Sequence, residues 1–143
     1  MTKPPEDPCA TEAKAAEDAE TAYIDNEDTI EYTLINAWKE RNKIYALTQD
    51  DNAAYPRIRE LADQVYDEAR NGRFALQAST ELYNTAANIN DDLKGAASSL
   101  GSLAQNHVAA LGQRLGLYNN YFAAMQALFI CRENNPEPEE ESE

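Results

Sequence analysis

Apolar and small side chains recur every seven residues along most of this chain, with polar residues between them. Between residues 10 and 50, one such row consists of Ala16, Tyr23, Ile30, Ala37 and Ile44. The same spacing continues from residue 62 to residue 128, and no stretch alternates apolar and polar residues as a half-buried strand does. Sustained seven-residue spacing is typical of long helices that pack in a coiled-coil-like manner. The pattern therefore predicts an all-α protein.

Two interruptions divide this pattern. Residues 48–52 are polar, and Pro56 suits the first turn of a following helix. Residues 88–92 are poor helix formers, and an asparagine or aspartate among them can cap a new helix. We therefore expect long antiparallel helices over residues 10–50, 54–89 and 91–132.

The near-equal lengths of these helices favour a three-helix up-down-up bundle. The alternative is a helical hairpin whose second helix runs over residues 54–132, because the seven-residue spacing passes through 88–95 without a shift in phase. In either arrangement the helices form a single domain, residues 10–133. Proline and charge bias predict an extended N-terminal arm, residues 1–9, and an extended acidic C-terminal tail, residues 134–143.

The acidic residues are concentrated at the two ends of the chain. The net charge is −14, from 26 Asp and Glu against 12 Lys and Arg. Residues 1–31 contribute −8, residues 32–131 only −1, and residues 132–143 contribute −5. A strongly acidic chain is a poor match for a nucleic acid or for an anionic membrane surface, so we expect direct binding to neither.

Residues 95–131 are unusually poor in charge for a surface helix, because Arg114 is the one charged residue among them. Burial on most sides explains such a composition, and a single three-helix bundle cannot bury the segment so fully. We therefore expect protein partners, through self-association or as other subunits of an assembly. The candidate interface consists of Leu100, Ala104, Leu111, Tyr118, Tyr121, Phe122, Met125 and Phe129.

Two other interpretations of the charge-poor segment remain open. Its Ser, Gln and Asn residues are compatible with a weakly polar face exposed to solvent. Reversible insertion into lipid is less favoured, because the segment lacks the Lys and Arg face of an interfacial helix. The longest strongly apolar stretch, residues 121–131, is also too short to span a bilayer, so we expect no membrane span.

The two cysteines, Cys9 and Cys131, lie near opposite ends of the chain. In an up-down-up bundle these positions lie at opposite ends of the bundle, too far apart for a disulfide within one chain. We therefore expect them to be reduced in a cytosol or to bond between chains stacked head to tail. A bridge within one chain would instead imply an even number of helical passes.

The sequence offers little material for catalysis. His107 is the one histidine, which excludes paired histidine metal motifs, and it lies in an otherwise apolar row. We interpret it as a hydrogen-bonded packing residue. Neither cysteine has zinc-ligand spacing, and the glycines form no phosphate-binding loop. We expect no enzymatic activity, no cofactor and no metal site.

These observations favour a non-enzymatic structural protein, a helical subunit of a larger multi-subunit particle such as a phage virion. The alternative is an acidic inhibitor or nucleic-acid mimic that binds a basic partner protein through its clustered carboxylates. Residues 1–18 contain no basic region followed by an apolar one, so we expect synthesis in the cytoplasm, with later incorporation into the particle.

Overall fold

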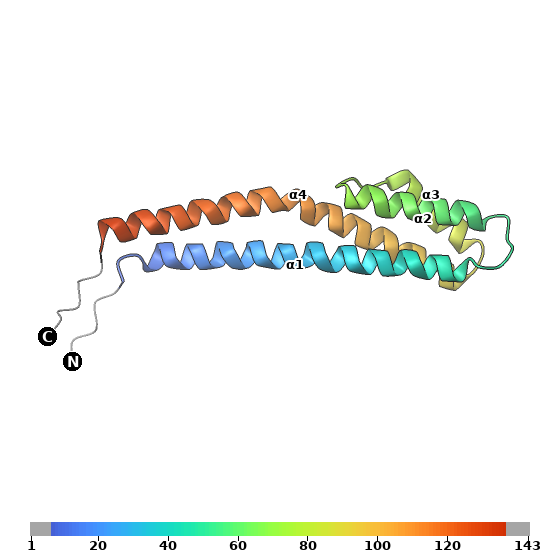
Figure 1. The fold of residues 1–143 in the computed structure, drawn as a ribbon, viewed down its shortest axis with the longest axis horizontal. Helices are drawn as coiled ribbons and strands as arrows, with labels where there is room; N and C mark the ends of the chain where they lie inside the picture. Colours follow the sequence, from blue (N-terminus) through green and yellow to red (C-terminus); the bar gives the residue numbers. More distant parts are fainter. Residues whose placement is uncertain (1–6, 137–143) are drawn as a thin grey trace, which may run out of the picture. The chain divides into compact units, whose positions relative to one another are not determined.

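The computed structural model describes residues 7–136, and these residues form helices joined by short connections, with no strand among them. The helices are α1 (Ala10–Leu47), α2 (Tyr55–Arg70), α3 (Leu76–Ala87) and α4 (Asp91–Asn134), as Figure 1 shows. The prediction of an all-α protein is confirmed. Most of the expected arm and tail lies outside the described residues.

The expected single helix over residues 54–89 is wrong, because α2 ends at Arg70 and α3 begins at Leu76. Gly72 has a φ of 84°, a left-handed conformation that favours glycine. The Gly72 N–H donates to the Ala69 carbonyl at 3.0 Å, and the Arg73 N–H donates to the Glu68 carbonyl at 2.8 Å. This pair of bonds is a Schellman motif, which satisfies the last carbonyls of α2 and ends the helix.

The connection between α3 and α4 lies at residues 88–90, where the sequence has poor helix formers. The Asn90 side-chain oxygen accepts the Leu93 N–H at 2.8 Å and thereby caps α4. A second helix running over 54–132 is therefore wrong. Since α2 and α3 are separate helices, the three-helix bundle is also replaced by four helices.

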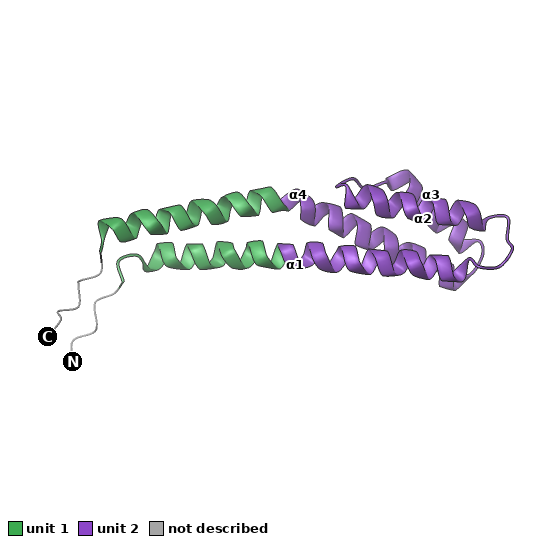
Figure 2. Cartoon of the chain, in the orientation of Figure 1, with its two compact units in different colours: residues 1–26, 114–143 green, residues 27–113 purple. Residues whose placement is uncertain are grey.

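The chain divides into two compact units (Figure 2). Unit 1 comprises residues 1–26 and 114–143, and unit 2 comprises residues 27–113. The first part of α1 and the second part of α4 belong to unit 1. The other parts of these two helices, together with α2 and α3, belong to unit 2.

Unit 2 has a well-developed apolar core to which all four helices contribute. Its fully buried large side chains are Ile44, Ile58, Leu61, Val65, Leu82, Leu93 and Leu100. Each such side chain contributes about 1.5–3 kcal/mol through burial. At the edge of this core, Asp63 of α2 accepts hydrogen bonds from Arg41 Nε, at 2.7 Å, and from the Tyr45 hydroxyl of α1.

Unit 1 is an antiparallel pair of helix segments with a much smaller core. Its buried residues are Cys9, Ala16 and Leu128, and Ala13, Ala124 and Cys131 pack against them. Alanine removes little apolar surface from water, so this cluster contributes less burial energy than the core of unit 2.

In the part of the chain that the structure describes, no helix is long and apolar enough to cross a membrane.

Candidate interface on the second part of α4

The structure places the eight predicted interface residues in different environments. Leu100 and Ala104 are fully buried in the core of unit 2, so the prediction that they form an interface is corrected: they are core residues. Leu111 is half-buried in the same unit. The exposed positions among the eight are Tyr118, Phe122, Met125 and Phe129, all in unit 1.

A line of exposed apolar side chains runs along α4 within unit 1. It consists of Leu115, Tyr118, Phe122, Met125 and Phe129, which are 69%, 50%, 58%, 39% and 63% exposed. Their spacing alternates between three and four residues, so they lie on one face of the helix. We call these five residues the α4 stripe. Leu115 is not among the predicted interface residues, although its position three residues before Tyr118 fits the same spacing.

A different face of α4 packs against α1 in unit 1. Leu128 is buried on this face, and Tyr121, Ala124 and Cys131 are partly buried. Tyr121 was predicted as part of the interface, but it is directed largely to the contact with α1. Apart from Tyr118, whose ring also contacts Tyr23 of α1, the α4 stripe is therefore additional to the surface that holds the helix pair together.

Tyrosine side chains fix the contact between α1 and α4 at this level. The Tyr23 ring lies 5.8 Å from the Tyr118 ring in an edge-to-face arrangement and 6.2 Å from the Tyr121 ring. The Tyr121 hydroxyl donates to Glu20 Oε2 at 3.3 Å. The negative charge of Glu20 raises the pKa of Tyr121, so the phenol stays protonated and keeps its proton for this hydrogen bond.

A shallow hollow of about 260 Å³ lies beside the stripe. Its walls are Glu20, Tyr23 and Ile24 of α1 and Tyr118 and Tyr121 of α4, all within unit 1. Ile24 is itself 46% exposed. The hollow thus extends the apolar surface of the stripe from α4 onto α1.

The stripe and its helix segment carry no charge. Residues 115–131 contain no Asp, Glu, Lys, Arg or His, and Arg114 and Arg132 stand just outside them. A contact made through this segment therefore buries no charged side chain of the segment. This combination of large exposed apolar side chains and absent charge is the composition of the central part of a protein interface.

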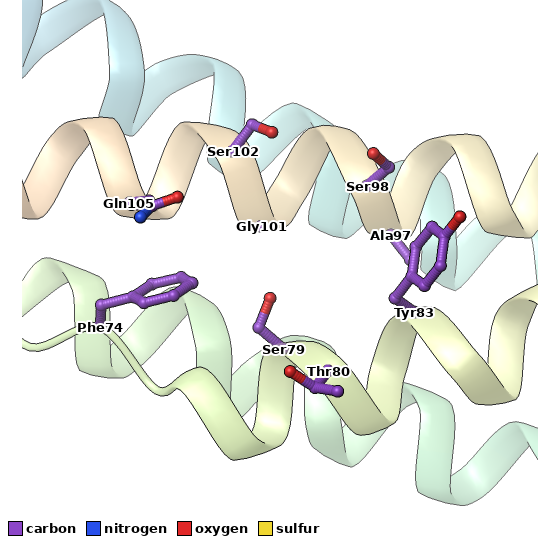
Figure 3. Close-up of a pocket in the computed structure, with 9 residues that line it drawn as sticks. All are labelled: Phe74, Ser79, Thr80, Tyr83, Ala97, Ser98, Gly101, Ser102 and Gln105. Carbon is purple, nitrogen blue, oxygen red and sulfur yellow. The ribbon is translucent and has the colours of Figure 1, made fainter.

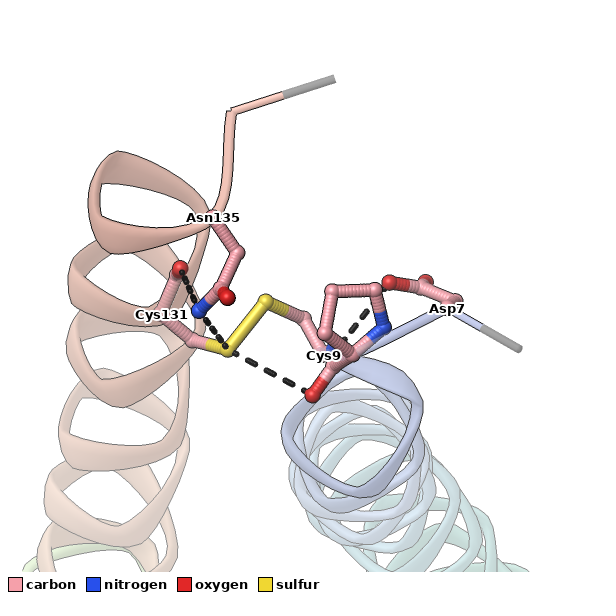
Figure 4. Close-up of a disulfide and its surroundings, with 5 residues drawn as sticks. Asp7, Cys9, Cys131 and Asn135 are labelled. Carbon is pink, nitrogen blue, oxygen red and sulfur yellow. Dashed lines mark hydrogen bonds between the residues drawn. A yellow bond between two sulfur atoms is a disulfide. The ribbon is translucent and has the colours of Figure 1, made fainter. Parts of the chain in front are cut away.

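Cys9 and Cys131 form a disulfide within the chain, with their Cα atoms 5.9 Å apart (Figure 4). The expectation of reduced thiols or of a bridge between chains therefore differs from the structure, and the described residues include no free cysteine. The reason is the number of helices: four passes, an even number, bring the two cysteines to the same end of unit 1. Just before α1, the Asp7 carboxylate accepts the Cys9 N–H at 2.9 Å beside the bridge.

His107 lies in unit 2, where it is 2% exposed, and its Nδ1 is 2.9 Å from Thr33 Oγ1. The Thr33 hydroxyl also lies 2.7 Å from the Thr29 carbonyl, to which it can donate, so the arrangement fits donation from His107 Nδ1–H to Thr33 Oγ1. Burial lowers the pKa of His107 and favours its neutral form. This geometry is that of a packing histidine.

A shallow pocket of about 260 Å³ lies between α3 and α4 in unit 2 (Figure 3). Its lining residues are uncharged: Phe74, Ser79, Thr80, Tyr83, Ala97, Ser98, Gly101, Ser102 and Gln105. The lining residues include serine and threonine hydroxyls but no histidine or carboxylate that could activate one of them as a nucleophile. In the described part of the chain, no group of three metal-ligating side chains comes together either.

Comparisons of this chain with protein-family models, with curated proteins and with solved structures found no match.

Proposed function

We propose that this chain is a non-enzymatic helical subunit that works by assembling with other protein chains, with the α4 stripe as its contact surface. The observation that carries the proposal is the stripe itself. With about 200 Å² for a large apolar side chain, its exposed fractions amount to about 550 Å². A patch of that size lies at the upper end of what monomers expose, and such patches are often functional.

The distribution of charge supports the same proposal. The exposed carboxylates Glu17, Asp18 and Glu20 of α1 keep the chain soluble and hydrated, while residues 115–131 contain no charged group. A chain with this division can hold acidic surface in water and place its uncharged surface against a partner. Direct binding to nucleic acid is not part of the proposal, because the acidic residues would repel phosphate groups.

The disulfide supports a particle that spends time outside a reducing cytosol. Disulfides form and persist in oxidising surroundings, including virion and cell surfaces. Cys9 and Cys131 can be oxidised after synthesis in the cytoplasm, once the chain has left that compartment. A virion or another exported particle is therefore the specific form of the proposal, and this localisation stays a prediction.

The test is the size of the native complex. In a gentle extract of its natural source, the chain should fractionate with a mass far above that of two copies of 15.9 kDa. The variant Phe122→Glu should leave that complex, whereas Asn120→Glu should remain in it, because residues two apart lie about 200° around a helix. If the natural protein fractionates as a monomer or a dimer, the proposed particle subunit is refuted.

The second candidate function is an acidic inhibitor or nucleic-acid mimic. The exposed carboxylates of α1 in unit 1 favour it, because Glu17, Asp18 and Asp25 lie close together in sequence on the solvent side. Binding of this kind to a basic partner weakens steeply as salt rises. Association through the uncharged stripe should instead persist or strengthen in high salt, so a salt series distinguishes the two functions.

A further inference from the structure

We propose that the α4 stripe packs against the same stripe of a second copy of this chain, antiparallel, around a two-fold axis that passes beside Phe122. The inference rests on the proposed function and specifies its first step: the stripe joins two copies into a closed pair, and other surfaces of that pair join it to the larger complex. It is carried by the spacing of the stripe, by the absence of charge along it and by the area that it exposes.

The spacing of the stripe is nearly symmetric about its central residue. Leu115 and Phe129 lie seven residues before and after Phe122, and Tyr118 and Met125 lie four before and three after. In a two-fold contact, residue i meets residue j of the partner and residue j meets residue i. An antiparallel pair therefore places Phe122 against Phe122 of the second copy and Leu115 against Phe129 of the second copy. Alternating spacings of three and four residues are also those of helices that pack side by side.

Charge favours a second copy over other occupants. Two copies that each carry −14 repel one another at most orientations, but a contact through residues 115–131 places no like charges opposite each other. A basic protein would be drawn to the carboxylates of α1, since the stripe offers it no opposite charge. A lipid surface is disfavoured because the exposed apolar face has no flanking row of Lys and Arg.

The exposed area agrees with a reversible dimer. Two stripes of about 550 Å² each, with Ile24 of both copies added, reach about 1,200 Å², the lower limit of stable specific interfaces. An interface of this size with aromatic residues at its centre should associate at roughly micromolar concentration. We therefore expect a dimer that dissociates on dilution.

The first experiment measures the mass of the purified, oxidised chain by sedimentation equilibrium from about 1 to 200 µM, a range that brackets a micromolar dissociation constant. The natural sequence should pass from monomer to dimer. Phe122→Glu should weaken dimerisation by roughly 100-fold or more, because two like charges would meet at the axis. Because Phe122 is more than half exposed, this substitution should leave the helical circular dichroism and the disulfide unchanged.

Two complementation tests define the geometry of the contact. Phe122→Lys alone should be as monomeric as Phe122→Glu, but an equimolar mixture of the two should form heterodimers, because opposite charges then meet at the axis. The double variant Leu115→Glu with Phe129→Lys should dimerise with itself, since in the antiparallel pair residue 115 faces residue 129. In a parallel pair the same variant would place like charges together. Asn120→Glu, on the other side of α4, is the matched control and should dimerise normally.

The inference is overturned if the natural chain stays monomeric at the highest concentration, if Phe122→Glu dimerises as well as Asn120→Glu does, or if the mixture of opposite charges forms no heterodimer. Failure of the Leu115→Glu/Phe129→Lys variant to dimerise overturns the antiparallel arrangement. These failures differ from failure of the proposed function: a monomeric purified chain that still enters a large native complex refutes this inference alone. A dimer that never enters such a complex refutes the proposed function alone.

Discussion

Removal of the Cys9–Cys131 disulfide should loosen unit 1 and leave the core of unit 2 folded. The two units differ in the internal contacts that stabilise each of them. Unit 2 has a large aliphatic core, whereas Leu128 is the one large aliphatic residue among the described members of the unit 1 cluster. The remaining buried contacts of that cluster come from alanine and from the disulfide itself. The double substitution Cys9→Ser with Cys131→Ser therefore removes the strongest constraint on this unit.

The magnitude follows from the length of chain that the bridge closes. The two cysteines are 122 residues apart in sequence. In the chain-entropy model, a loop of this length corresponds to about 5 kcal/mol of stabilisation when the whole chain unfolds, and to about 4 kcal/mol when only residues 9–26 and 114–131 open while unit 2 stays folded. Burial of one leucine contributes only about 1.5–3 kcal/mol. The bridge thus outweighs the aliphatic burial in the cluster of unit 1, and its loss should lower the melting temperature by roughly 10–20 °C.

Hydrogen exchange measured by mass spectrometry provides the assay, because it reports each segment separately. In the double variant, residues 10–26 and 114–134 should lose most of their protection. Residues 55–70 and 91–104 should keep it, because their side chains form the core of unit 2. Addition of a phosphine reductant to the natural protein should reproduce the effect. Ala127→Ser, an exposed change in the same unit, should alter neither protection nor melting temperature.

Continued protection of residues 10–26 and 114–134 without the bridge would contradict this prediction. That result would mean that the tyrosine contacts of Tyr23 and the Glu20–Tyr121 hydrogen bond hold the helix pair without covalent help. Equal loss of protection in both units would also refute it, since the core of unit 2 would then depend on the bridge.

Two further predictions concern unit 2. Because burial lowers the pKa of His107 below its ordinary value of 6.5, the unfolded chain takes up a proton at a higher pH than the folded one. The stability due to neutral His107 is thus present above about pH 6.5 and is lost as pH falls through the folded pKa. Urea unfolding between about pH 7.5 and 5 should show this loss in the free energy of unfolding, and His107→Gln should reduce the pH dependence. An unchanged pH dependence in that variant would contradict the assignment. A Cβ added to Gly101 would lie 2.7 Å from Ser79 Oγ. Gly95→Ala, in open space, should raise the free energy of unfolding by about 1 kcal/mol through helix propensity, and Gly101→Ala should raise it by less. Adding Ser79→Ala to Gly101→Ala should recover the difference. Equal gains from the two single variants would show that the close approach is absent.

The seven-residue spacing predicts that the chain is helical, but it predicts only some of the helix ends. The polar residues at 88–92 interrupt the apolar pattern, and the structure has a connection there, capped by Asn90. The turn at residues 71–75 does not interrupt the apolar spacing, because Gly72 falls in a row most of whose members are small or apolar. A glycine that ends a helix and a glycine that allows close packing look the same in a periodic pattern. Only the left-handed conformation of Gly72 distinguishes them.

The apolar spacing also identified only some of the exposed interface residues correctly. Ala104, Leu111, Tyr118 and Met125 form one seven-residue row, yet the first is buried, the second half-buried and the last two exposed. Seven residues of a straight α-helix turn about 20° less than two full turns, so such a row drifts around the helix. The neighbours also change: α4 packs within a four-helix core in unit 2 but against α1 alone in unit 1. Spacing therefore identifies an apolar face without showing whether that face is covered.

The pairing of the cysteines depends on the turn at Gly72. With helices over 10–50, 54–89 and 91–132, the chain makes three passes, and Cys9 and Cys131 lie at opposite ends. Division of the middle segment into α2 and α3 gives an even number of passes, because the two short helices form a hairpin of their own, joined by the Arg57–Glu81 ion pair at 2.9 Å. The cysteines then meet at 5.9 Å between their Cα atoms. A glycine turn in unit 2 thus determines whether the bridge that holds unit 1 can form within one chain, and a bridge within the chain leaves the proposed contact between copies without a covalent link.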